Sequence, residues 1–199
     1  MNELYALLDR YTAAGDAPAA AAVEAELWRR WGVDRAVLVL DMSGFSRLVR
    51  RWGIVHYLSL VRQMHRVTEP LVHATGGEVV KFEADNLYAA FADTESAVTA
   101  ARAIRAAFRD LNLRLPADRD IHVAIGVAWG RILLMPGQDY FGDAVNIACK
   151  LGEDLAERGE ILVDAKAFET LPVDARQGFE HSTWSISGLQ LDAWLLPAA

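Results

Sequence analysis

VVKFEADNLYAAF, residues 79–91, contains two short apolar runs on either side of a tight acidic turn. Both runs have strand composition, and the turn between them is short enough for a β-hairpin. Lys81 near the end of the first run and Asp85 at the start of the second are therefore expected to lie close together at one end of a sheet. Taken alone, these charges fit a solvated pair on a hairpin, so their meaning depends on the rest of the chain.

Length and composition indicate one globular domain. The chain has 199 residues, of which 53% are hydrophobic, and its mean hydropathy is +0.12. The net charge of -7 argues against binding to DNA or RNA, because no basic excess exists to neutralise a phosphate backbone, but it leaves a single nucleotide open. Cys149 is the sole cysteine, which excludes an internal disulfide and favours a cytoplasmic location.

No stretch of the sequence predicts a membrane span. The longest run without Asp, Glu, Lys or Arg, residues 181–191, has 11 residues and is far shorter than the roughly 18 apolar residues that a spanning helix needs. Acidic residues near the N-terminus also break the pattern of a signal peptide. We therefore expect no membrane partner.

Helical and strand patterns alternate along the chain. The first 33 or so residues predict two helices, and Asp16 is placed to cap the second. An apolar strand at 36–40 is followed by a helical region over 46–75, with a kink expected at Pro70. Later patterns predict a helix capped by Asp93 or Thr94, two strands separated at Gly130, a helix over 143–156 and a closing strand pair. This order predicts an α+β fold.

Four segments stand in an order that resembles the class III nucleotidyl cyclase domain: VLVLDMSGFS, GGEVVKFEADNLYAAF, HVAIGVAWGRILL and DYFGDAVNIACKLGEDLAERGEILV. The resemblance covers about residues 36–196. It implies a ferredoxin-like cyclase domain at 36–199, with a central, mostly antiparallel sheet flanked by helices. Residues 1–35 then form a helical N-terminal extension with a role in dimerisation or regulation.

The resemblance also implies a metal site. In the family, the 3′-hydroxyl of a nucleoside triphosphate attacks its own α-phosphorus and pyrophosphate leaves, assisted by two divalent ions, Mg²⁺ or Mn²⁺. Asp41 and Asp85 match the two metal-binding aspartates, and the carbonyl of Met42 would complete the site. An aspartate that ends a strand is often only a turn residue, so the pairing of the two carries this interpretation.

A turn after the first strand is the candidate phosphate site. Ser43, Gly44, Phe45 and Ser46 lead into a helix, whose N-terminal N–H groups can bind phosphate oxygens. Gly44 could instead serve only to allow a sharp turn. Arg131 is a further candidate phosphate ligand.

Lys81 and Asp139 match the family's base-reading residues. Adenine presents an acceptor at N1 beside its 6-amino donor, so a lysine and an aspartate side by side suit ATP. Guanine presents the opposite pattern, which disfavours GTP. Cytosine offers the same edge as adenine, so CTP remains open.

Asn146 matches the asparagine that orients the ribose, and Lys150 stands where the family usually has an arginine that stabilises charge on the phosphate. Lysine keeps the charge but loses the planar fork. Three further departures are Ala84 in place of a glycine, Glu83 as an extra carboxylate, and Ser187 in place of a phosphate-binding lysine.

In the family, the metal aspartates of one chain face the base-reading and ribose-orienting residues of a second chain. The resemblance thus implies a homodimer with two shared sites. Adenylate cyclase activity on ATP is the favoured function. The alternatives are a weakly active or non-catalytic nucleotide-binding dimer, and a cyclase that acts on GTP or CTP.

Overall fold

The computed structural model describes residues 1–43, 45–116, 119–186 and 189–198, and of residues 45–48, 186 and 189 it describes only the backbone. Its α-helices are α1 (Asn2–Thr12), α2 (Ala17–Trp31), α3 (Phe45–Trp52), α4 (Ile54–Ala74), α5 (Thr94–Asn112), α6 (Asp143–Cys149) and α7 (Ala165–Thr170). A π-helical segment, Lys150–Leu155, continues α6, and a short 3-10 helix spans Val173–Arg176. The strands are β1 (Gly32–Met42), β2 (Glu78–Glu83), β3 (Asn86–Phe91), β4 (Val123–Met135), β5 (Asp139–Phe141), β6 (Ile161–Asp164), β7 (Glu180–Ile186) and β8 (Leu189–Leu196).

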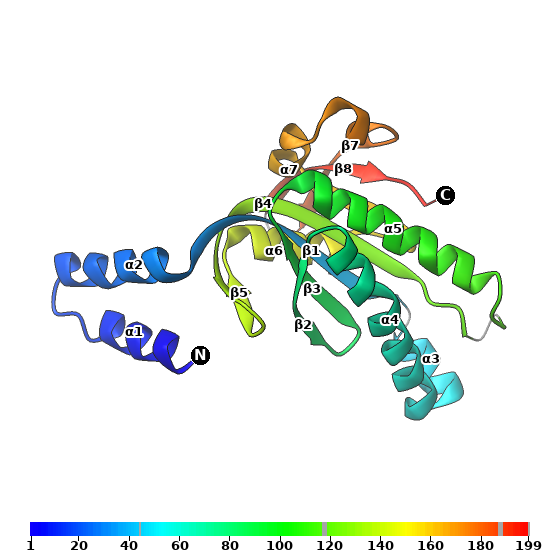
Figure 1. Cartoon of the computed structure of the whole chain (residues 1–199), viewed down its shortest axis with the longest axis horizontal. Helices are drawn as coiled ribbons and strands as arrows, with labels where there is room; N and C mark the ends of the chain where they lie inside the picture. Colours follow the sequence, from blue (N-terminus) through cyan, green and yellow to red (C-terminus); the bar gives the residue numbers. More distant parts are fainter. Residues whose placement is uncertain (44, 117–118, 187–188, 199) are drawn as a thin grey trace.

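Within the described residues, the strands form one eight-stranded sheet in the order β2-β3-β1-β4-β6-β8-β7, with β5 paired to β4 (Figure 1). The β4–β6 pair is parallel and the other pairs are antiparallel. β1 lies at the centre between β3 and β4. The expected α+β fold with a mostly antiparallel sheet is confirmed.

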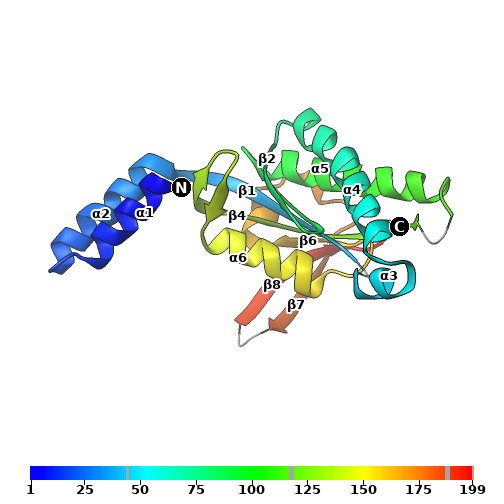
Figure 2. The same ribbon diagram turned by 90° about the horizontal axis from the view of Figure 1, so that it is seen from below.

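β1 is buried on both faces, which explains its unbroken apolar run. Leu38 and Leu40 pack into a core cluster that includes residues of α4 and α5. Val37 and Val39 point to the other side, against α6. Figure 2 shows α6 on the opposite side of the sheet from α4 and α5. Helices on both faces thus fix the direction of β1, whose last residues carry Asp41.

The expected helix caps are present. The Asp16 carboxylate accepts a hydrogen bond from the N–H of Ala19 at 2.8 Å, and the Asp93 carboxylate accepts one from the N–H of Ser96 at 2.7 Å. Each satisfies one of the backbone donors that a helix leaves unpaired at its first turn.

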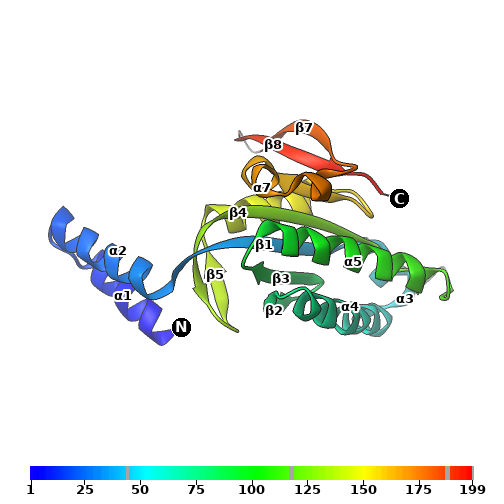
Figure 3. The same ribbon diagram turned by 45° about the horizontal axis from the view of Figure 1, so that its top comes forward.

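The two N-terminal helices pack on each other and project from the body of the sheet (Figure 3). Their buried side chains are Leu4, Leu7, Val23 and Leu27, which cluster with Met135 at the end of β4. The extension therefore packs against the end of β4 through a small apolar cluster that is separate from the main core.

Three local expectations need correction. The helical region 46–75 breaks at Gly53, where φ is 85°, whereas α4 runs through Pro70 to Ala74. β4 continues through Gly130 without interruption. The glycine there makes room for α6, since an added Cβ would lie 3.1 Å from Ala144. The helix expected over 143–156 changes to a π-helical segment at Lys150.

None of the helices in the described ranges combines the length and the apolar character needed to cross a membrane.

Candidate active site

Asp41 and Asp85 come together where β1 ends beside the β2–β3 turn. Asp41 pairs in register with Asn86 of β3, and the N–H of Met42 donates to the carbonyl of Asp85 at 3.2 Å. Burial, followed by the charges of Asp85 and Glu153, raises the pKa of Asp41 from 3.8 to about 6. We refer to Asp41, Asp85 and Glu153 as the carboxylate cluster.

The turn that presents Asp85 has only two residues, Ala84 and Asp85, since Glu83 pairs directly with Asn86. Ala84 has φ of 52°, a left-handed conformation that costs a non-glycine residue about 1–2 kcal/mol. This is the position where the resemblance expected glycine. The His65 ring stacks on Phe82 with 3.8 Å between ring centroids and interacts with the backbone of Ala84. α4 therefore supports the strained turn from below.

Tyr57 of α4 is a neighbour of the carboxylate cluster that the sequence did not reveal. Its side chain is 3% exposed. Burial, followed by the charge and hydrogen bonding of the Asp85 carboxylate, raises the pKa of the Tyr57 hydroxyl. The one available signal was a tyrosine on the apolar stripe of α4, whose polar tip needs a partner when buried.

Lys81 and Asp139 lie side by side, with the Lys81 ammonium 3.3 Å from the Asp139 carboxylate. Glu83 also contacts this ammonium at 3.0 Å, and the ring of Tyr88 lies beneath it at 5.0 Å. Burial acts to lower the pKa of Lys81, but Glu83 and Asp139 outweigh burial and raise it. The lysine is thus a charged donor. Its ion-pair partners are these two carboxylates, whereas the hairpin alone had suggested proximity to Asp85.

Asn146 and Lys150 lie one helical turn apart, since the N–H of Lys150 donates to the carbonyl of Asn146. The helix sits close to the sheet: a Cβ on Gly126 would come within 2.3 Å of the Ala148 carbonyl, and one on Gly152 within 2.7 Å of the Val39 carbonyl. These two glycines allow the π-helical segment to lie directly on β1 and β4.

Glu153 connects the π-helical segment to strand β3. Its carboxylate accepts hydrogen bonds from Asn86 at 3.1 Å and from the Tyr88 hydroxyl at 3.0 Å. Burial and then Glu153 raise the pKa of the Cys149 thiol to about 12, so this cysteine is not a thiolate near neutral pH. Nothing in the local pattern separated Glu153 from other helix carboxylates.

The turn after β1 is described only in part. The N–H of Ser43 donates to the carbonyl of His122 at 2.8 Å, so that particular donor is already used. Gly44 lies outside the described residues, as do the side chains of Phe45 and Ser46 at the start of α3. Ser187 also lies outside them.

Arg131 lies far from Asp41 within its own chain. It pairs with Asp34, seven residues along β1 from Asp41, or about 23 Å along the strand. Its guanidinium lies 5.1 Å from the centre of the Trp28 ring of α2. The structure therefore places Arg131 against the N-terminal extension.

The carboxylate cluster has the chemistry of a cation site. Burial, followed by the charges of Asp85 and Glu153, raises the pKa of Asp41, and a divalent cation would relieve the repulsion among these carboxylates. No group of three or more His, Cys, Asp or Glu side chains in the described part of the chain is arranged to hold a metal ion by itself. Asp41, Asp85 and the Met42 carbonyl would thus need further oxygen ligands, such as phosphate oxygens or water.

A single chain brings only some of the candidate residues into direct contact. Lys81 and Asp139 are in contact, whereas no hydrogen bond or ion pair in the described ranges joins Asn146 or Lys150 to Asp41 or Asp85.

Comparisons with known proteins agree with this geometry. Residues 34–190 match the adenylate and guanylate cyclase catalytic domain. A Rhizobium meliloti protein, provisionally named adenylate cyclase 3, is 35% identical over 128 residues, which are 64% of this chain and 22% of that protein. An adenylate cyclase of Streptomyces coelicolor is 32% identical over 142 residues, which are 70% of this chain and 35% of that protein. The chain thus spans about a fifth to a third of these relatives.

A solved structure described as an adenylate/guanylate cyclase/hydrolase from Silicibacter pomeroyi has a TM-score of 0.73 and 26% sequence identity, and the match covers 84% of this chain and 98% of that one. A bacterial light-regulated adenylyl cyclase shares the fold with a TM-score of 0.69 and 20% identity, over 82% of this chain and 51% of that one. The chain belongs to the class III adenylate and guanylate cyclase catalytic domain family.

Proposed function

We propose that this chain is an adenylate cyclase that converts ATP into 3′,5′-cyclic AMP and pyrophosphate at two sites shared across a homodimer. The contact between Lys81 and Asp139 at 3.3 Å is the observation that carries the proposal. It puts a donor beside an acceptor, as the N1 and 6-amino edge of adenine requires. The relatives named as adenylate cyclases support the same substrate.

Both base-reading side chains keep free capacity for adenine. An ammonium has three N–H donors, and two of those of Lys81 are directed to Glu83 and Asp139. One Asp139 oxygen accepts from Lys81 and from the N–H of Tyr140 at 2.9 Å. Its second oxygen remains for the 6-amino group. Glu83 therefore fixes the lysine without using all of its donors.

In the proposed reaction, the 3′-oxygen forms a bond to the α-phosphorus, and the bond from that phosphorus to the β-phosphate oxygen breaks. Pyrophosphate leaves with the electron pair, and the hydroxyl proton is released. Asp41, Asp85 and the Met42 carbonyl would hold two divalent ions, Mg²⁺ or Mn²⁺, which neutralise charge on the attacking and leaving oxygens. Asn146 orients the ribose, and Lys150 stabilises the negative charge on the transferring phosphate.

The lack of a hydrogen bond or ion pair between Asn146 or Lys150 and the two aspartates, in the described part of one chain, is consistent with a shared site. An exposed apolar patch on α3 and α4 is formed by Trp52, Ile54, Val55 and Leu58, and α4 also carries the buried Tyr57, whose hydroxyl interacts with Asp85. Exposed apolar patches next to a site often mark an interface. A second copy of the chain would cover this patch and bring Asn146 and Lys150 to the carboxylate cluster. The extension over 1–35 would assist dimerisation or regulation.

The interface is tested with Val55→Asp and Leu58→Asp, whose parent side chains are 77% and 55% exposed. Leu113→Asp, at an 82% exposed position beyond α5, is the matched control. Light scattering after gel filtration should show monomers for the first two variants and dimers for the control. Dimers in all three would place the interface elsewhere.

The reaction is tested by incubating the purified chain with ATP, GTP, CTP or UTP and Mn²⁺, and identifying products by mass spectrometry. Cyclic AMP is expected from the wild type and none from Asp85→Ala. Lys81→Ala should lower the preference for ATP over GTP about tenfold or more, because a lost base contact weakens discrimination. Lys166→Ala, at an exposed position on α7, should not. Binding of ATP without any cyclic product would instead support the non-catalytic alternative.

A further inference from the structure

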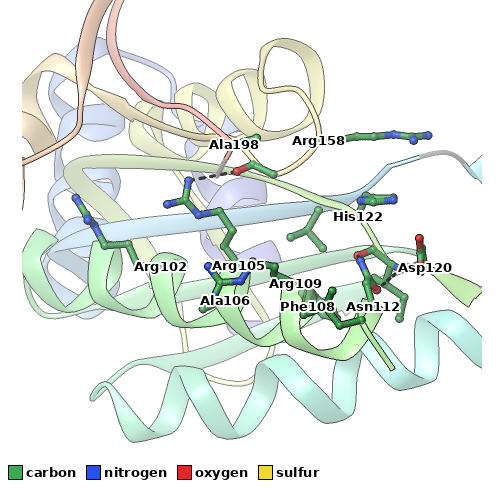
Figure 4. A pocket seen from close by; sticks show the side chains of 14 residues that line it. Arg102, Arg105, Ala106, Phe108, Arg109, Asn112, Asp120, His122, Arg158 and Ala198 are labelled. Carbon is green, nitrogen blue, oxygen red and sulfur yellow. Dashed lines mark hydrogen bonds between the residues drawn. The ribbon is translucent and has the colours of Figure 1, made fainter. Parts of the chain in front are cut away.

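A second charged region surrounds a cavity of about 440 Å³ between α5, the start of β4 and the turn before β6. Figure 4 shows Arg102, Arg105 and Arg109 extending from α5, with Arg158 on the opposite side of the cavity. We call this cavity, with its four arginines, the arginine cavity. Asp120 is the one carboxylate among its described lining residues. This local positive excess contrasts with a chain whose net charge is -7.

Two of the arginines are held in place by neutral groups. Arg105 donates to the carbonyl oxygens of Pro197 at 2.7 Å, Gly159 at 3.3 Å and Leu196 at 3.4 Å. Arg102 donates to the carbonyls of residues 175 and 177 at 3.1 and 2.8 Å. Carbonyl oxygens orient a guanidinium but do not neutralise it. Both side chains are therefore oriented by neutral groups, and no carboxylate of the described residues pairs with them.

The other two arginines are more exposed. Arg109 pairs with its sequence neighbour Asp110 at 3.2 Å, and because both side chains are more than half exposed, this pair contributes little. Arg158 makes no hydrogen bond or ion pair within the part of the chain that the structure describes. Burial, followed by the charges of Arg102 and Arg109, lowers the pKa of Arg105, in agreement with positive charges crowding one another.

We propose that the arginine cavity binds a small phosphorylated molecule that also carries hydroxyl groups, such as a sugar phosphate. Guanidinium groups bind phosphate through paired hydrogen bonds, and the volume is within the range of small-molecule pockets, about 300–1,000 Å³. At the end near Asn112, one carboxylate oxygen of Asp120 is buried and has no hydrogen-bond partner among the described residues. That oxygen is closed to solvent, but Asp120 also lines the cavity, and a carboxylate oxygen that faces it would accept a hydrogen bond from a ligand hydroxyl.

The arginine cavity adjoins the turn that follows Asp41. Asn112 bonds both the N–H and the carbonyl of Ile121, at 3.0 and 2.9 Å, which ties the cavity wall to α5. The next residue, His122, accepts the N–H of Ser43 at 2.8 Å. A ligand in the cavity therefore contacts a segment that is hydrogen-bonded to the end of β1. The binding site itself does not depend on the proposed cyclase reaction.

Calorimetric titration of the full chain in EDTA tests this site with glucose 6-phosphate, inorganic phosphate and glucose as probes. EDTA removes the divalent ions that the proposed catalytic site needs. Glucose 6-phosphate should bind most tightly, inorganic phosphate more weakly, and glucose not at all. Arg158→Ala and Arg109→Ala should each weaken glucose 6-phosphate binding about tenfold or more, since each removes a charged hydrogen-bond donor.

Asp120→Ala should reduce the affinity for glucose 6-phosphate to that for inorganic phosphate, because the hydroxyl acceptor is lost. Arg29→Ala on α2 removes the same charge elsewhere and should change nothing, and Asn146→Ala should also bind normally. Circular dichroism checks that each variant is folded. Absence of binding at millimolar glucose 6-phosphate, or equal binding by wild type and the Arg109→Ala/Arg158→Ala double variant, would overturn the proposal.

Discussion

The carboxylate cluster gathers negative charges and the arginine cavity gathers positive ones, and both regions adjoin the same short segment, residues 120–123. Met42 pairs with Val123 on one side, and residues 120–123 line the arginine cavity on the other. In both regions the pKa moves towards the neutral form, upwards for Asp41 and downwards for Arg105. In both, burial is the larger cause and neighbouring like charges add to it. A bound cation would relieve the repulsion in the cluster, and a bound anion that in the cavity.

The two regions differ in how their charges are held. Asp41 and Asp85 are short side chains fixed by strand pairing and a two-residue turn. The arginines have long side chains, and carbonyl oxygens hold two of them. Placement by the backbone suits catalysis, where small displacements are costly, whereas in the cavity only Arg109 and Arg158 lack such carbonyl contacts among the described residues.

The largest effect is expected from the carboxylate cluster. Asp41→Ala or Asp85→Ala should lower turnover about a thousandfold or more, because each would remove a ligand of the proposed catalytic ions. The fold should remain, since each change relieves repulsion. Cyclase assays at saturating Mn²⁺ with circular dichroism check both points. Substantial activity in either variant would exclude the two-metal assignment.

Complementation tests whether the cluster acts on a second chain. Asp85→Ala and Asn146→Ala should each be inactive alone. Mixed in equal amounts, they should recover about a quarter of wild-type activity, because half of the dimers are mixed and each of those has one intact site. The assay needs proof by differential tagging that mixed dimers form. Proven mixed dimers without activity would place both groups in one chain.

Lys150 is expected to have a smaller effect than the aspartates. Lys150→Ala should lower kcat about 100-fold, roughly 3 kcal/mol, with little change in ATP affinity, as for loss of one donor to a developing negative charge. Lys150→Arg should retain or raise kcat, because its fork can bind two oxygens. If the alanine variant keeps kcat within about threefold of wild type, Lys150 is only a surface residue.

The pH dependence of Mn²⁺ binding should follow Asp41. Its pKa is about 6 in the metal-free chain, so below pH 6 a proton competes with the ion. Affinity should rise about tenfold per pH unit up to pH 6 and then level off. The folded chain holds this proton more tightly than the unfolded chain, so without metal this group favours the fold at low pH. That contribution is lost as the pH rises from 3.8 to about 6. Calorimetry of wild type and Asp41→Asn checks both effects.

The sequence predicted features with a strong local pattern. The apolar run of β1, the hairpin and the caps at Asp16 and Asp93 are confirmed, because burial and capping act over a few residues. Lys81 and Asp139 are 58 residues apart in sequence, and only the resemblance to the family predicted that they would lie side by side.

What the sequence could not predict depends on tertiary packing. Tyr57 reaches Asp85 only because α4 crosses beneath the hairpin, and Glu153 faces Tyr88 through a π-helical segment. A helix with regular spacing would direct that side chain differently. The helical region breaks at Gly53 because that residue has a positive φ, which a helix cannot contain. Pro70 lies near the end of α4, and the helix continues through it to Ala74.

The smallest effect concerns the strain that holds Asp85. Ala84 has φ of 52°, which costs about 1–2 kcal/mol for alanine, while glycine adds a chain-entropy cost of about 0.5–1 kcal/mol. Ala84→Gly should therefore raise the free energy of unfolding by about 0.5–1 kcal/mol, or Tm by about 2 °C. Ala107→Gly inside α5 should lower the stability by about 1 kcal/mol. Urea unfolding of both variants measures the difference. If Ala84→Gly is as destabilising as Ala107→Gly, the turn is unstrained, and His65 and Tyr57 rather than the backbone of Ala84 determine the position of Asp85.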